Sequence, residues 1–162
     1  MPQYLLMIKK RRWDYLEAGW LGAQEIQADP LGDLRIEEGN LSVWHIDDDK
    51  TNLDLVISAL ASARQSLDKF EYALFDQKLI RQINIQTRET PGNTPIKPAN
   101  SWHRDLIHLT IDKTAQLVKA IFHNAEKRRL LEDDVKERIK KCVDQEMLDL
   151  QKIPSSFRNK LT

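Results

Sequence analysis

The densest reactive chemistry in this sequence lies in residues 102–110, WHRDLIHLT, which contain His103, Arg104, Asp105 and His108. A histidine oriented by a carboxylate can act as a general base. In a strand, His103 and Asp105 would share one face while Arg104 and His108 take the other. In a helix, Arg104 and Asp105 would both lie within one turn of His108. These residues allow a small metal-independent nuclease or transferase, with His45 in support, and they are equally compatible with a surface pair near a helix start.

A second candidate is the stretch 41–53, LSVWHIDDDKTNL. In a strand, His45 shares a face with Leu41 and Val43. The aspartates at 47–49 precede an apolar run with helical spacing, and carboxylates are favourable before the positive end of a helix dipole. Thr51 and Asp54 also match the spacing of a capping box. Helix initiation therefore explains the acidic run, and we predict no metal site and no cofactor.

The third candidate is a basic run, Lys9, Lys10, Arg11 and Arg12, directly before Trp13. Clustered cations can bind phosphates while an aromatic ring stacks on a base. Trp13, however, falls on a helical stripe with Leu16 and Trp20, which favours a core position. A further basic run at 127–129 is followed at once by acidic residues at 132–134, as in helices with internal ion pairs.

Composition limits the functions that these candidates can serve. The 162 residues contain 25 Lys and Arg and 25 Asp and Glu, so any nucleic-acid contact must depend on a local patch. Cys142 is the only cysteine, which excludes an internal disulfide and a thiolate zinc site within one chain. The sequence lacks a Gly-rich dinucleotide motif, a P-loop, a nucleophile elbow and an H-E-x-x-H motif. It also lacks a secretory signal and an apolar run long enough for a membrane span, so we expect a cytoplasmic protein that does not bind membranes.

The elements that must position these residues follow from periodicity and turn chemistry. In the first two thirds of the chain we expect a strand at 4–8, a helix at 10–21, a hairpin of 34–36 with 41–46, a helix at 53–67, a strand at 69–75, a short helix at 76–82, a strand at 83–87 and a Pro-rich loop at 90–98. Residues 106–111 fit a strand or a helix, and helical spacing resumes from residue 110.

The C-terminal part differs, because residues 126–153 are densely charged around one narrow apolar stripe. The stripe consists of Leu131, Val135, Ile139, Val143 and Met147. So narrow a stripe covers a neighbour and does not build a core by itself. We therefore expect an α+β domain at 1–125 with a sheet of about four to five strands, a long charged C-terminal helix at 126–153 and a flexible tail at 154–162. The helix either docks on its own domain or reaches another protein chain or a second copy.

Taken together, the sequence favours a non-enzymatic accessory or assembly protein of a cytoplasmic multi-protein system, which acts through protein–protein contacts of the C-terminal helix. Two alternatives stay open. One is the nuclease or transferase that uses His103, Asp105 and His108, and the other is an RNA- or DNA-binding module that uses Lys9–Arg12.

Overall fold

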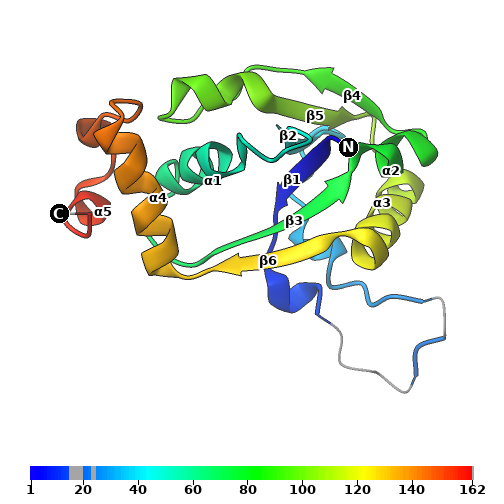
Figure 1. Ribbon diagram of the computed structural model, residues 1–162. Helices are drawn as coiled ribbons and strands as arrows, with labels where there is room; N and C mark the ends of the chain where they lie inside the picture. The colour runs from blue at the N-terminus through cyan, green and yellow to red at the C-terminus, as the bar shows by residue number, and fades with distance from the viewer. Residues whose placement is uncertain (15–19, 23–24, 162) are drawn as a thin grey trace.

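The computed structural model describes residues 1–14, 20–22 and 25–161 of the chain. In this described part, six antiparallel strands form one sheet in the order β4-β5-β2-β1-β3-β6 (Figure 1). The strands are β1 (Gln3–Met7), β2 (Leu41–Ile46), β3 (Phe70–Asp76), β4 (Gln86–Glu89), β5 (His103–Ile107) and β6 (Glu126–Leu130). The predicted sheet with packed helices is confirmed, but it has six strands and not four to five, because two charged or polar segments, 103–107 and 126–130, also pair as strands.

Helices cover both faces of the sheet, since the central strands are apolar on both sides (Figure 1). Strand side chains alternate between faces, so Leu5 of β1 points to one side while Tyr4 and Leu6 point to the other. Leu5 packs against α1 (Leu53–Ser62) and α4 (Glu132–Asp144), and we call this side the α1/α4 face. Tyr4 and Leu6 pack against α2 (Gln77–Gln82) and α3 (Ile111–Asn124), on the α2/α3 face.

The helices on the α2/α3 face begin at side-chain caps that the sequence supplies. The Asp76 carboxylate accepts a hydrogen bond from Lys78 N at 2.8 Å at the start of α2. Thr110 Oγ1 accepts from Lys113 N at 3.2 Å at the start of α3. Each cap satisfies a backbone donor that the first helical turn leaves without a partner. The short helix expected at 76–82 and the helix expected from residue 110 are confirmed.

The expected hairpin is wrong in its pairing. Residues 34–36 form no strand, and only an isolated bridge joins Glu37 to Asn40 around a turn in which Gly39 has φ of 75°. The neighbours of β2 are instead β1 and β5, which lie about 40 and 60 residues away in the chain. Pairing with strands distant in the chain outweighs the local turn signal.

The prediction of a long C-terminal helix at 126–153 is also wrong. Residues 126–130 form β6, which pairs with β3, and only residues 132–144 form α4. After α4 the chain forms two short turns of helix, η4 (Leu150–Lys152) and α5 (Ser155–Arg158), and Phe157 and Leu161 are buried in the core. Local charge pairing suggested a helix at 126–130, but a strand there allows Arg129 to form an ion pair with Glu71 across the sheet.

No helix in the described residues is both long enough and apolar enough to cross a lipid bilayer. Residues 15–19 of the predicted helix at 10–21, Leu16 among them, lie outside the described ranges, and its described beginning is the short 3₁₀ turn η1 (Lys10–Arg12).

Candidate functional site

β5 brings His103 and Asp105 together on the α1/α4 face, as the extended arrangement predicts. His103 Nε2 lies 3.9 Å from Asp105 Oδ1. Thr90 lies between the two side chains: its Oγ1 donates to Asp105 Oδ2 at 2.9 Å and lies 2.9 Å from His103 Nδ1. His103 Nδ1 also lies 3.1 Å from the carbonyl oxygen of Thr90, which can only accept, so this nitrogen carries the proton.

The carboxylate of Asp105 is occupied by groups of its own chain. Besides Thr90, Ser42 of β2 donates to Oδ1 at 3.3 Å, and Arg88 of β4 lies 3.7 Å from Oδ2. The side chain of Asp105 is only 15% exposed. One carboxylate thus ties together β2, β4 and the segment after β4. Asp105 cross-links the sheet, and sequence reasoning missed Ser42 and Thr90 because they lie 63 and 15 residues from it with no local motif.

The Pro-rich loop packs beside His103. Asn100 Oδ1 accepts hydrogen bonds from Thr94 N at 2.9 Å and from Thr94 Oγ1 at 2.7 Å, which folds the loop back on itself. An added Cβ at Gly92 would come within 2.7 Å of the Trp44 ring, so only glycine allows this close approach. The Trp44 ring in turn meets His103 edge-on, with ring centroids 5.1 Å apart. His103 thus has close neighbours from β2 and from the segment after β4, and 13% of its side chain is exposed.

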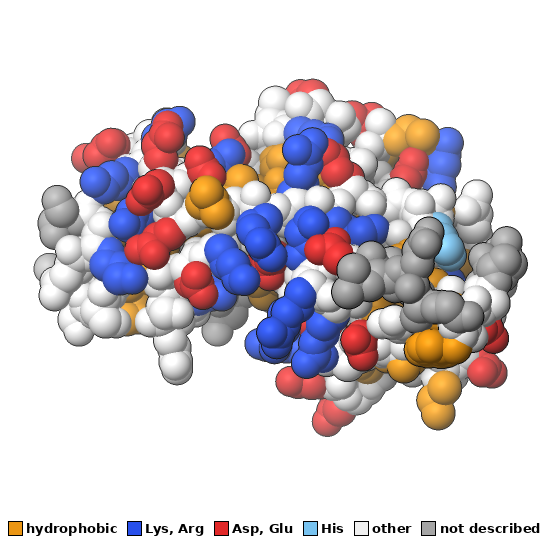
Figure 2. All heavy atoms as spheres, turned by 90° about the horizontal axis from the view of Figure 1, so that it is seen from below, with side chains coloured by type: hydrophobic (Ala, Val, Ile, Leu, Met, Phe, Trp, Pro, Cys, Tyr) orange, Lys and Arg blue, Asp and Glu red, His pale blue; other side chains and the backbone are white. Residues whose placement is uncertain are grey.

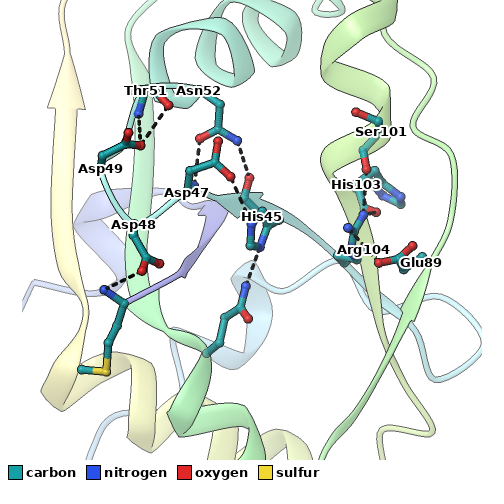
Figure 3. A network of polar contacts seen from close by, with 12 residues as sticks. His45, Asp47, Asp48, Asp49, Thr51, Asn52, Glu89, Ser101, His103 and Arg104 are labelled. Atoms are coloured by element: carbon teal, nitrogen blue, oxygen red, sulfur yellow. Dashed lines mark hydrogen bonds and ion pairs between the residues drawn. The ribbon is translucent and has the colours of Figure 1, made fainter.

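Arg104 and His108 lie apart from this pair. Arg104 is on the opposite side of β5 and forms an ion pair with Glu89 at 3.0 Å (Figure 3). His108 follows the end of β5 with φ of 57°, and its Nδ1 lies 3.1 Å from Gln86 Oε1. The four candidate residues therefore do not face one shared space, although their catalytic role stays a prediction.

His45 and the acidic run have local partners as well (Figure 3). His45 Nδ1 lies 2.6 Å from the Gln77 amide nitrogen, and its Nε2 lies 3.3 Å from Asp47 Oδ1. The buried Asn52 closes the loop, because its amide donates to the His45 carbonyl and accepts from Asp47 N. The predicted capping box is wrong: α1 begins after Asn52, and Thr51 instead donates to Asp49 Oδ1. No three His, Cys, Asp or Glu side chains gather as a metal would require in the part of the chain that the structure describes.

The two basic runs, which are more than 110 residues apart in sequence, meet on the α2/α3 face beside β6. Glu71 joins them: its carboxylate accepts from Arg129 Nε at 2.6 Å and from Lys10 N at 3.3 Å, and its side chain is 8% exposed. Asp33 holds η1 from the other side, because its Oδ2 accepts from Lys9 N at 2.6 Å and from Trp13 Nε1 at 2.8 Å. The sequence holds no local signal for either carboxylate, since both act across the fold.

We define the basic surface by the side chains of Lys9, Lys10, Arg11, Arg12, Lys127 and Arg129. Strand alternation turns Arg128 to the opposite face. Figure 2 shows Lys and Arg side chains gathered on this side of the molecule, with Asp and Glu among them. Burial lowers the pKa of Lys127, while nearby Asp14 raises it and Lys10 lowers it further. Trp13 is 1% exposed, as predicted, so its ring is in the core and cannot stack on a base.

The predicted partner stripe lies mostly within the fold. Val135 and Ile139 are fully buried against α1, and Val143 and Met147 pack against the same core. Arg138 fastens α4 to α1 through Asp54 at 2.9 Å. Leu131, at the start of α4, is 64% exposed and is the stripe residue that faces outward.

Comparisons of the chain with protein-family models, with curated proteins and with solved structures gave no match.

Proposed function

We propose that this protein is a non-enzymatic accessory protein of a cytoplasmic multi-protein system, and that it acts by binding another protein. The observation that carries the proposal is the basic surface, where two distant basic runs converge on an exposed side of the fold. Interfaces that select a partner commonly do so by complementary charge, which steers encounter and fixes orientation. The apolar stripe of the C-terminal helix is largely buried. We therefore propose that the partner protein binds at η1 and β6 and not at that helix.

The polar clusters support the same proposal. Asp105 accepts from Ser42 and Thr90 and pairs with Arg88, and His103 Nδ1 is bonded to Thr90. A general base must reach a proton on a bound substrate. Side chains whose polar atoms are already bonded to neighbouring strands fit a structural role better than a catalytic one.

Affinity purification of the tagged chain from its native host tests the proposal. We expect one or a few proteins in stoichiometric amounts, identified by mass spectrometry, and an absorbance ratio that shows no bound nucleic acid. The His103→Ala and His108→Ala variants should retain this partner. Co-purifying nucleic acid in place of protein would contradict the proposal. So would an RNA-cleaving or transferase activity that His103→Ala abolishes while the thermal midpoint is unchanged.

A further inference from the structure

A hollow opens beside η1, at one end of the basic surface. Arg11, Arg12, Ala28, Asp29 and Gly32 line it among the described residues, and it has a volume of about 520 Å³. An added Cβ at Gly32 would come within 2.9 Å of Arg12 Nη1. The glycine therefore leaves room for the guanidinium of Arg12 to lie along the turn η2 (Leu31–Asp33).

The cations around this hollow fall into two groups. Lys10 is paired with Asp14 at 3.1 Å, Arg129 is held by Glu71, and Lys127 Nζ donates to the Phe122 carbonyl at 2.8 Å. Lys10 and Arg129 are paired with carboxylates of the chain, and Lys127 is held by a backbone oxygen.

The second group consists of Lys9, Arg11 and Arg12. Within residues 1–14, 20–22 and 25–161 the side chains of these three form no ion pair and no hydrogen bond, and Lys9 and Arg11 are exposed. Two guanidinium groups without a partner thus line one hollow. Guanidinium groups bind carboxylates and phosphates through paired, charge-assisted hydrogen bonds, and arginine is enriched among residues that dominate binding energy in interfaces.

The surroundings favour a carboxylate of a protein over the phosphates of a nucleic acid. Asp29 lines the hollow, and Asp14 and Asp33 lie on either side of η1. These carboxylates repel a continuous polyanion, whereas a protein partner can place a cation opposite each of them. The chain as a whole is neutral, and the nearby Trp13 ring is buried and cannot stack on bases.

We infer that the hollow is the anchor for an acidic segment of the partner protein, with Arg11 and Arg12 binding its carboxylates. This inference rests on the proposed function and assigns the chemistry of the partner.

A binding assay with a fluorescent acidic peptide, in which pairs of glutamates alternate with single lysines, tests the inference directly. We compare the wild-type chain with Arg11→Glu/Arg12→Glu, with Arg12→Lys and with the control Lys140→Glu, an exposed position on α4 across the sheet. The double variant should weaken binding by about tenfold or more, Arg12→Lys by less, and Lys140→Glu by less than about twofold. Binding of the wild type should fall as salt is raised.

Three results would overturn the inference: no binding of the peptide by the wild type, an equal loss in Lys140→Glu, or tighter binding of a charge-matched oligonucleotide than of the peptide. The last result would assign the surface to nucleic acid.

The native partner separates this inference from the proposal beneath it. If the double variant captures the same protein as the wild type, the hollow is not the anchor, although the binding function stands. If the wild type captures no specific protein, the proposed function fails.

Discussion

The polar cluster around Asp105 and the basic surface around Arg12 use charge in opposite ways. Asp105 is 15% exposed and satisfied by side chains from three segments, so its charge holds the sheet together. Arg11 and Arg12 line a hollow beside η1, and among the described residues no carboxylate pairs with them. A charge that is fully paired inside a fold stabilises it, while a charge held in place without a partner is available to a ligand. Because of this difference, we expect the functional contact at η1 and β6 and not at the histidines.

The same distinction applies to α4, which the sequence suggested as a partner helix. Its apolar stripe faces α1 and the core, so most of its binding capacity is used within the chain.

Ile139→Ala should give the largest loss of stability. Ile139 is fully buried between α4 and the core, and removing its side chain leaves a cavity. We expect the free energy of unfolding to fall by about 2–5 kcal/mol, measured by urea denaturation. Leu131→Ala at an exposed position is the control and should change stability by less than about 0.5 kcal/mol. Similar small losses in both variants would mean that α4 is not docked as described.

Asp105→Ala should come next. The change leaves the hydroxyls of Ser42 and Thr90 and the cation of Arg88 without their acceptor. We expect a loss of about 1–3 kcal/mol in the free energy of unfolding. Asp144→Ala, at an exposed position at the end of α4, should be nearly neutral. If Asp105→Ala keeps full stability and abolishes an enzymatic activity, Asp105 belongs to an active site and the comparison is reversed.

Glu71→Gln should change both the stability of the fold and the binding of the peptide. The amide cannot neutralise Arg129, which then adds an unpaired cation to the basic surface. We expect a loss of about 1–2 kcal/mol in stability together with tighter binding of the acidic peptide. Denaturation and fluorescence anisotropy on the same sample measure the two effects. Weaker peptide binding despite an intact fold would argue against charge as the basis of recognition.

The Arg11→Glu/Arg12→Glu variant should have the smallest effect on stability. Neither side chain contributes an ion pair to the described fold. The free energy of unfolding, followed by the thermal midpoint, should therefore change by less than about 0.5 kcal/mol. A large loss of stability would show that these arginines hold the fold and are not free for a partner.

Much of the fold could be predicted from local pattern. The alternation in 69–75 and the apolar run at 4–8 predicted β3 and β1, and helical spacing from residue 110 predicted α3. Trp13 was correctly assigned to the core. The strands that local pattern did not predict, β5 and β6, lie in charged or polar segments, where periodicity is weak. Residues 126–130 have no apolar alternation, and their strand depends on pairing with β3 more than 50 residues away.

The sequence by itself determined the candidate residues, the buried faces of the central strands and the absence of familiar catalytic motifs, because these depend on residue type and local spacing. Only the tertiary structure decided which charges are paired. Glu71 neutralises Arg129 across 58 residues and fastens Lys10, while Asp33 pins η1 beside the hollow that Arg11 and Arg12 line. Ion pairs and hydrogen bonds need their two groups in close contact, and the distances between residues remote in sequence are fixed only once the chain has folded.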